Sequence, residues 1–231
     1  MRILAPTALL YAALGALMLP SAVTLAIWAG CVAAPALAIA LGSGTLRLRR
    51  EIWLRESELL HACRYDSLSG ALSRAYLTEL AQHDLALAKR HGRSLGVAML
   101  DIDHFKGVND AYGHSVGDAV IRALTSTCMT TLRATDYVGR LGGEEFACVF
   151  PEAGEEEALA CAERVREPFA GLEIPSAPPE LRCTVSIGIA VYRGERDWET
   201  LLREADRALY GAKAAGRNRV VLAEPRQAVA G

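Results

Sequence analysis

The chain has 231 residues, of which 23% are charged, and its formal net charge is −2 at pH 7. A chain of this length holds one or two domains, and the near-neutral charge excludes a general nucleic-acid-binding or other polyanion-binding protein. Any phosphate ligand must therefore be held by local groups. The six cysteines form no C-x-x-C pair and no cluster with histidine, which predicts reduced thiols in a cytosolic domain rather than a metal centre or a disulfide framework.

Residues 1–46 are expected to form a transmembrane segment, because Ile3–Leu46 contains no charged residue. One helix over this stretch would be roughly 66 Å long, whereas the hydrocarbon core of a bilayer is about 30 Å thick. Two helices, at about 3–19 and 21–41, fit this thickness better, with Pro20 at the break between them. The segment is therefore predicted to be a helical hairpin.

Arginines flank the apolar segment on both sides, with Arg2 before it and Arg47, Arg49 and Arg50 after it. By the positive-inside rule both ends of a hairpin then lie in the cytoplasm. One spanning helix with its amino end outside stays open as an alternative. A cleaved signal peptide fits less well, since the apolar stretch is too long and no clear A-x-A site precedes a polar start.

Residues 47–65 are interpreted as a helical linker in which charged and apolar residues alternate. Leu46, Trp53 and Leu60 recur every seven residues, which is typical of an amphipathic helix. Two interpretations remain open, a short parallel coiled coil and a helix that lies on its own domain.

Residues 66–224 read as one α/β (α+β) domain, followed by a tail at 225–231. Strands and helices alternate around a central antiparallel hairpin, which predicts a ferredoxin-like or palm-type mixed sheet with helices around it. The expected elements are a turn at 66–74, a helix to about 91, a strand at 94–103, a loop to 117, a helix at 118–133, a hairpin around 142–143, a helix at 155–170, a loop at 174–180, a strand at 181–192, a helix at 198–216 and a strand at 218–222.

Carboxylates follow two of these predicted strands. Asp101 and Asp103 end the apolar strand, and strand geometry places their side chains on one face. Glu144 directly follows the hairpin glycines Gly142 and Gly143, which permit a positive φ and leave room for a bulky anion. If the hairpin lies beside the strand, Asp101 and Glu144 converge, and carboxylate oxygens suit Mg²⁺ together with substrate phosphates. The alternatives are a strand that ends in solvent and an ordinary turn with solvated glutamates.

Further polar residues have no apolar periodicity to explain them. Asn109, His114 and Asp118 follow the acidic strand end, and the asparagine and the aspartate offer the donors and acceptors that a guanine edge needs. Lys213 and Arg217 end the last predicted helix, where they can meet a triphosphate. The alternative for these two is a basic helix terminus that interacts favourably with the helix dipole.

The combination of these motifs resembles the GGDEF domain of diguanylate cyclases, bacterial enzymes that make cyclic di-GMP. The resemblance covers about 160 residues in the family's order, and the signature here reads Gly-Gly-Glu-Glu-Phe, a variant that active members accept. Position 69 is serine where the family usually has threonine. The matching segments are DSLSGALSR (66–74), DIDHFKGVNDAYGHSVGD (101–118), RLGGEEF (140–146), VSIGIA (185–190) and ADRALYGAKAAGRN (205–218).

The resemblance implies a nucleotidyltransferase that condenses two GTP into cyclic di-GMP and two pyrophosphates, with Mg²⁺ or Mn²⁺, as a homodimer anchored in the cell inner membrane with a cytoplasmic catalytic domain. It also implies a product-inhibition site of the form R-x-x-D at Arg133 and Asp136. The implied roles are metal binding by Asp101, the Ile102 carbonyl, Glu144 and Glu145, proton acceptance by Glu144, nucleotide binding by Asn109, His114 and Asp118, and phosphate binding by Lys106, Lys213 and Arg217.

Two alternatives to this activity stay open. The domain can be a catalytically silent receptor for cyclic di-GMP that uses Arg133 and Asp136, although the intact Glu144, Asn109 and Asp118 argue against it. It can also be a metal-dependent cyclase on the same fold that uses ATP.

Overall fold

The computed structural model describes residues 49–55, 61, 63–194 and 197–224. The predicted membrane helices and the tail lie outside these residues, and in the part that is described no helix is both long and apolar enough to cross a membrane. The chain divides into two compact units, Met1–Glu58 and Leu59–Gly231. Residues 49–55 of the first unit are helical, and Ile52 and Trp53 are exposed there.

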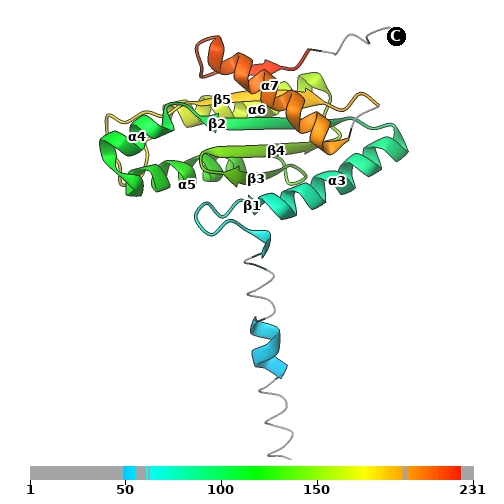
Figure 1. Ribbon diagram of the computed structural model, residues 1–231, viewed down its shortest axis with the longest axis horizontal. Coiled ribbons are helices and arrows are strands. Elements are labelled where there is room, and N and C mark those ends of the chain that lie inside the picture. Colours follow the sequence, from blue (N-terminus) through cyan, green and yellow to red (C-terminus); the bar gives the residue numbers. More distant parts are fainter. Residues whose placement is uncertain (1–48, 56–60, 62, 195–196, 225–231) are drawn as a thin grey trace, which may run out of the picture. The chain divides into compact units, whose positions relative to one another are not determined.

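A six-stranded sheet in the order β1-β3-β4-β2-β5-β6 forms the centre of the second unit (Figure 1). The central strand β2 pairs antiparallel with both β4 and β5, whereas the edge strands β1 and β6 pair parallel with β3 and β5. The strands are β1 (Leu72–Ser73), β2 (Leu95–Ile102), β3 (Tyr137–Gly142), β4 (Glu145–Pro151), β5 (Val185–Val191) and β6 (Val220–Leu222).

Helices connect the strands in the β-α-β-β-α-β order of a split βαβ arrangement, with further elements at each end. The predicted mixed α/β sheet and its central hairpin, β3 and β4, are therefore confirmed. The helices are α3 (Arg74–His91), α4 (Phe105–Tyr112), α5 (His114–Thr131), α6 (Glu155–Gly171) and α7 (Trp198–Ala214).

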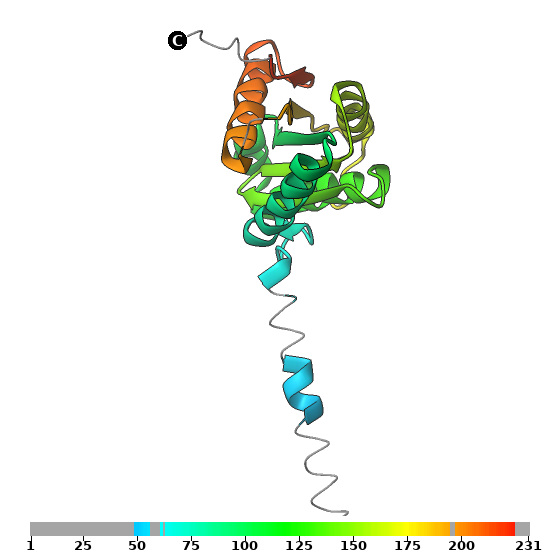
Figure 2. The same cartoon turned by 90° about the vertical axis from the view of Figure 1, so that its right-hand side faces the viewer.

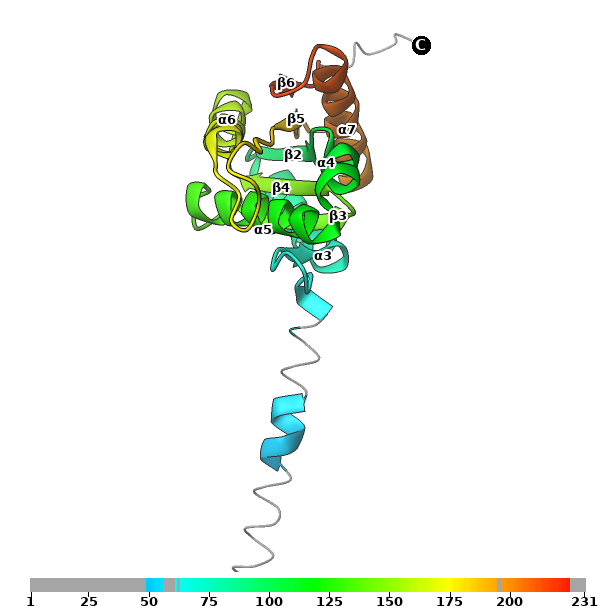
Figure 3. The same ribbon diagram turned by 90° about the vertical axis from the view of Figure 1, so that its left-hand side faces the viewer.

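The sheet separates two apolar clusters because strand side chains alternate between its faces. In β2, Val97 and Met99 pack with α3 and α7, whereas Leu100 and Ile102 pack with α5 and α6. Figures 2 and 3 show these two helical layers on opposite sides of the sheet. Asp101 lies two residues after Met99 in the strand, so its side chain is on the same face of the sheet, the face covered by α7.

Gly188 of β5 allows α7 to lie directly on this face of the sheet. A Cβ at Gly188 would stand 2.0 Å from the Leu209 backbone nitrogen and 2.2 Å from the Ala205 carbonyl oxygen. The glycine in the sequence VSIGIA is therefore required by the close approach of the helix. This packing brings the end of α7, with Lys213, over the end of β2.

The predicted loop between residues 103 and 118 is wrong, because two helices occupy it. Phe105 and Val108 lie one helical turn apart and are both buried, which gives α4 an apolar face of only two residues. Gly113, with φ 82°, ends α4, and α5 begins at His114, four residues earlier than predicted. The apolar face was too short to stand out as a helical period.

Candidate functional site

The end of β2 places a buried carboxylate beside a lysine. Asp101 is 7% exposed, and its Oδ2 lies 2.8 Å from Lys213 Nζ. Burial raises the pKa of the Asp101 carboxyl, the Lys213 ammonium opposes this rise, and the negative charges of Glu144 and Asp103 add to it. Glu144 is thus close enough for its charge to act on Asp101, and the two predicted acidic groups share one region.

The register explains how the hairpin reaches this region. The β2–β4 ladder ends where Asp101 faces Glu145, so the turn that carries Glu144 begins at the end of β2. The backbone N–H of Asp103 donates to the Thr184 carbonyl of the segment before β5, at 2.8 Å. Because successive backbone groups of a strand point to opposite sides, the Ile102 carbonyl points toward the β4 side, where the turn lies.

Oxygen donors of this kind fit a hard divalent cation. No group of three or more histidine, cysteine, aspartate or glutamate side chains with metal-binding geometry occurs among the described residues. Magnesium does not require one, because it usually keeps several waters and takes one or two carboxylates together with substrate phosphates. Asp101, Glu144 and the Ile102 carbonyl therefore fit Mg²⁺ or Mn²⁺, and they do not fit the nitrogen and sulfur sites that zinc prefers.

Arg140 hydrogen-bonds to the backbone of the diglycine turn. Its Nε and Nη2 donate to the Gly143 carbonyl at 2.9 and 2.7 Å, and its Nη1 donates to Asp66 Oδ1 at 2.9 Å. Gly143 has a φ of 53°, and apart from the adjacent residues of the chain no described atom lies within 4 Å of the place of a Cβ at Gly142 or Gly143. The turn thus adopts a backbone conformation that glycine accommodates without strain, and Arg140 fixes the Gly143 carbonyl while the Cα positions of both glycines stay open.

Asp66 anchors this arginine. Burial would raise the pKa of the Asp66 carboxyl, but hydrogen bonds from the Ser69 hydroxyl and backbone N–H and from Arg140 outweigh it, so the pKa lies below its usual value. A cavity of about 660 Å³ opens beside the turn. It is lined by Tyr65, Asp66, Ser67, Ser73, Arg74, Arg140, Leu141, Gly142 and Gly143.

Asn109 of α4 lies directly against Gly117 of α5. Its Oδ1 is buried and has no hydrogen-bond partner among the described residues, and a Cβ at Gly117 would stand 2.0 Å from it. An unsatisfied amide oxygen is costly unless a ligand completes its hydrogen bonds. Asp118 lies half-buried one residue further on, whereas His114 and Lys106 are exposed on the same two helices.

Several residues of this region were missed in the sequence. Arg140 and Asp66 stand out in the sequence only as parts of motifs, and no local pattern shows that their side chains meet. Asp103 is buried and accepts hydrogen bonds from Thr184 and Ser186 rather than facing a cation. Thr184 and Ser186 alternate along their segment, and this polar period of two was the available signal.

The R-x-x-D residues line a separate cavity of about 290 Å³. Asp136 Oδ2 accepts the backbone N–H of Arg133 at 3.0 Å, and the Cys161 thiol lies 3.9 Å from the same oxygen. Arg164 donates to Cys161 Sγ at 3.1 Å, so α6 closes one side of this loop. The other lining residues are Tyr65, Leu72, Cys128, Met129, Leu132, Ala134, Tyr137 and Val138.

The cysteines of the described part of the chain are all free thiols. A hydrogen bond with Cys128 and burial raise the pKa of Cys148, and burial raises the pKa of Cys161. The thiols of Cys148 and Cys161 are therefore protonated and poor nucleophiles at neutral pH.

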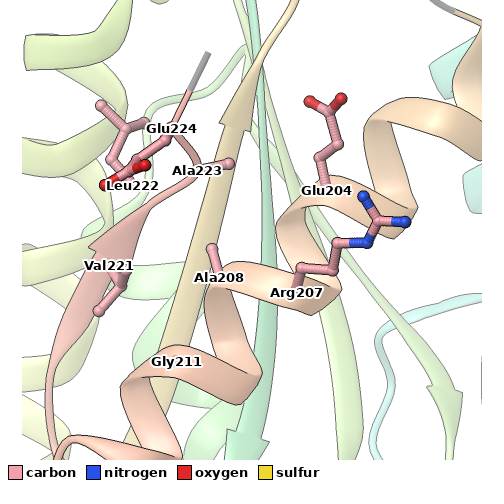
Figure 4. Close-up of a pocket in the computed structure, with 8 residues that line it drawn as sticks. All are labelled: Glu204, Arg207, Ala208, Gly211, Val221, Leu222, Ala223 and Glu224. Atoms are coloured by element: carbon pink, nitrogen blue, oxygen red, sulfur yellow. The ribbon is translucent and has the colours of Figure 1, made fainter. Parts of the chain in front are cut away.

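A further cavity, of about 320 Å³, lies between α7 and β6 (Figure 4). Ala208 and Gly211 of the helix and Val221 of the strand line it, with Glu204 and Arg207 along the helix. None of the predicted site residues lines this cavity, so it is not part of the candidate site.

Fold and site together define a class: a mixed-sheet α/β domain with acidic and basic side chains at one end of its central strands. The chain belongs to the family described as "Diguanylate cyclase, GGDEF domain", whose family model matches residues 63–219.

Curated relatives and solved structures agree with this assignment. The chain is 39% identical over 181 residues to diguanylate cyclase DosC of Escherichia coli (strain K12), covering 78% of this chain and 39% of that protein. It thus spans well under half the length of this relative. The coiled coil and GGDEF domain of DgcB from Caulobacter crescentus in complex with c-di-GMP has a TM-score of 0.75 and 29% identity, covering 81% of this chain and 99% of that one.

A third similarity concerns the signature. The active GGEEF domain of a diguanylate cyclase from Vibrio cholerae has a TM-score of 0.63 and 32% identity, and covers 66% of this chain and 97% of that one. A glutamate in the position of Glu144 is therefore compatible with activity in a relative of the same fold.

Proposed function

We propose that this protein is a diguanylate cyclase that condenses two GTP into cyclic di-GMP and releases two pyrophosphates. The observation that carries the proposal is the ion pair between Asp101 and Lys213 at the end of β2, next to the diglycine turn that carries Glu144. Family membership and the active GGEEF relative support it.

Asp101, the Ile102 carbonyl and Glu144 would hold Mg²⁺ or Mn²⁺, and Glu145 would contribute to a second ion. Such an ion supplies charge neutralisation at the α-phosphate and eases the departure of pyrophosphate. Asn109 and Asp118 bind the guanine edge, and His114 makes a further nucleotide contact. Lys106, Lys213 and Arg217 bind the phosphates, with Lys213 already at the acidic strand end.

Glu144 has a second role in this proposal. The 3′-oxygen of one GTP attacks the α-phosphorus of the other, the bond from that phosphorus to the bridging oxygen of pyrophosphate breaks, and Glu144 accepts the proton of the 3′-hydroxyl. Each domain holds one GTP, so two copies must face each other and the enzyme works as a homodimer. Anchoring in the cell inner membrane, with the catalytic domain in the cytoplasm, would raise the effective concentration of that pair.

Product inhibition completes the proposal. Arg133 and Asp136 line a cavity with apolar walls and present a guanidinium and a carboxylate there. A guanidinium suits the phosphate of cyclic di-GMP and a carboxylate suits a guanine edge. Accumulated product would bind at this site and slow synthesis.

The first prediction concerns Glu144→Gln, which removes the negative charge and the proton acceptor without changing the shape. Loss of a group with both roles is expected to lower the rate of cyclic di-GMP formation at least about 100-fold. The assay follows product from GTP and Mg²⁺ by chromatography, with the thermal midpoint as a check of folding. Glu156→Gln, at an exposed position of α6, is the matched control and is expected to stay active.

Three outcomes separate the alternatives. Full activity of Glu144→Gln would refute the role of this residue. Binding of cyclic di-GMP without any synthesis by the wild-type chain would identify a silent receptor. Guanine recognition would be refuted if the wild-type chain turned over ATP as fast as GTP and if Asn109→Ala left the two rates unchanged.

A further inference from the structure

Asp103 is a buried carboxylate that the proposed reaction does not use. It is 4% exposed, and its two oxygens accept three hydrogen bonds. The hydroxyl of Ser186 donates to Oδ1 at 2.6 Å, whereas the Thr184 hydroxyl and the Asn218 backbone N–H donate to Oδ2 at 2.7 and 3.0 Å. Burying an ionised carboxylate is costly unless such donors compensate it, so its partners indicate what it holds in place.

One of these partners belongs to an unusual turn. Gly216, Arg217 and Asn218 follow α7 with φ values of 111°, 62° and 42°. Two consecutive non-glycine residues in the left-handed region cost backbone free energy, and such a conformation persists only where the surroundings determine it strongly. The backbone N–H of Arg217 donates to the Ala212 carbonyl at 3.0 Å, which ties the turn to the end of the helix.

The same turn is held from a second side by α6. Arg166 Nη1 donates to Asn218 Oδ1 at 3.0 Å. The Arg166 guanidinium also pairs with Glu163 at 2.7 Å and with Glu167 at 3.5 Å, and its side chain is 17% exposed. Its direction is therefore fixed by its own helix, and Asn218 is fastened at its backbone by Asp103 and at its side chain by Arg166.

This fastened turn lies next to the candidate site. Asp103 follows Asp101 by two residues, and Asp101 contacts Lys213 in the last turn of α7. Arg217 lies between Lys213 and Asn218 in the chain, at the centre of the turn. Because a long side chain on a mobile turn loses conformational entropy when it binds a ligand, a turn fixed beforehand binds that ligand more tightly.

We propose that Asp103 is a positioning residue: together with Arg166, which acts through Asn218, it fixes the left-handed turn that presents Arg217 to the phosphates of the nucleotide. The inference rests on the proposed function, in which Arg217 binds the GTP phosphates. It assigns the second aspartate of the D-x-D pair to the phosphate side of the site rather than to a cation.

The test is a binding experiment on the full chain in Mg²⁺ that compares α,β-methylene-GTP with guanosine, which lacks phosphates. Asp103→Asn keeps the shape of the side chain but replaces one carboxylate oxygen with an NH₂ group. That group is a donor, and it would face the hydrogen-bond donors of Thr184, Ser186 or Asn218. Affinity for the triphosphate is expected to fall about tenfold, as for the loss of one charge-assisted contact, and affinity for guanosine is expected to stay within about twofold. Glu156→Gln is the control for an equal loss of charge.

A double-variant cycle shows whether Asp103 acts through Arg217. Arg217→Ala is expected to weaken triphosphate binding about as much as Asp103→Asn does. If one acts through the other, the double variant binds no more weakly than Arg217→Ala alone, because residues in one network are not additive. A merely structural role would multiply the two effects and weaken guanosine binding as well.

Asn218→Gly serves in case Asp103→Asn does not fold. Glycine adopts the left-handed turn freely and keeps the N–H that Asp103 accepts, but it removes the acceptor of Arg166 and loosens the turn. Triphosphate affinity is expected to fall about three- to fivefold with no change for guanosine. The inference would be overturned if both variants bound α,β-methylene-GTP as tightly as the wild-type chain does. It would also be overturned if Asp103→Asn lost the same affinity for α,β-methylene-GTP and for guanosine. Failure of the wild-type chain to prefer GTP over ATP would instead refute the proposed function.

Discussion

Gly117 and Asn109 lie so close together that a single methyl group would displace the side chain of Asn109, a predicted guanine-binding residue. Gly117→Ala would place a Cβ 2.0 Å from Asn109 Oδ1 and push that side chain out of its position. Alanine is otherwise favoured over glycine inside a helix by up to about 1 kcal/mol. GTP affinity is therefore expected to fall at least about tenfold while stability changes by no more than about 1 kcal/mol, as measured by calorimetry and urea unfolding.

Gly107→Ala is the matched control for this prediction. Gly107 also lies in a helix, α4, but among the described residues no atom other than those of its chain neighbours and its own helix backbone is within 4 Å of the place of its Cβ. This substitution is expected to stabilise the helix and leave GTP affinity unchanged. If both alanine variants bound GTP like the wild-type chain, Asn109 would not be a guanine-reading residue.

Asp66 gives a prediction about pH. Its pKa lies below the ordinary 3.8 in the folded state, so its ionised form contributes stability that is present above that value and is lost as the pH falls through the lower folded pKa. The wild-type chain is therefore expected to be more stable than Asp66→Asn at pH 7, and the difference is expected to shrink below about pH 4.

Urea unfolding of both proteins between pH 3 and 7 measures this difference directly. A gap in the free energy of unfolding that stays constant down to pH 3 would show that the ionised Asp66 does not stabilise the fold. Asp197→Asn is a useful comparison, since Asp197 caps α7 through the Thr200 N–H and its pKa is also lowered, but it lies away from the diglycine turn.

At the scale of the elements, the hairpin and the central strand were predictable because each has a local signal. The strand β2 changes from apolar to acidic at Asp101, and the glycines Gly142 and Gly143 lie between two apolar runs. Their convergence needed only the assumption that the hairpin pairs with the strand. The short helix α4 was not predicted, because Phe105 and Val108 are too few to define a period.

Contacts between distant segments were not predictable from any local pattern. Asp103 meets Thr184 and Ser186 only because β5 pairs with β2 in one particular register, and it meets Asn218 only because α7 ends above them. A shift of the register by one residue would move every side chain of the strand to the opposite face of the sheet. Motif spacing therefore locates the groups of the site but does not show which of them hold the others in place.

At the scale of the whole molecule, the proposed reaction needs two copies of the domain, because each contributes one GTP and one set of acidic groups. Two condensations are required for each product. The first joins the 3′-oxygen of one nucleotide to the α-phosphorus of the other and releases pyrophosphate, which gives a linear dinucleotide with a triphosphate end. The second closes the ring in the same way at the other domain.

This division predicts the behaviour of mixed dimers. A fixed amount of wild-type chain is mixed with a large excess of Glu144→Gln, so that most active chains pair with an inactive one. In each mixed pair, the wild-type domain can activate the α-phosphate of its bound GTP, whereas the Glu144→Gln domain cannot. The linear dinucleotide is therefore expected to become the main product, and cyclic di-GMP is expected to fall by about tenfold or more, as quantified by chromatography.

The control is an equal excess of Glu156→Gln, which pairs with the wild-type chain but keeps Glu144, and which is expected to give cyclic di-GMP without the linear species. A dimer that carried out both condensations in one domain would behave differently. Cyclic di-GMP would then form in proportion to the wild-type chain at any excess of the inactive variant, and no linear dinucleotide would appear. That result would contradict the shared site, because the proposed mechanism requires Glu144 on both sides of the interface to close the ring.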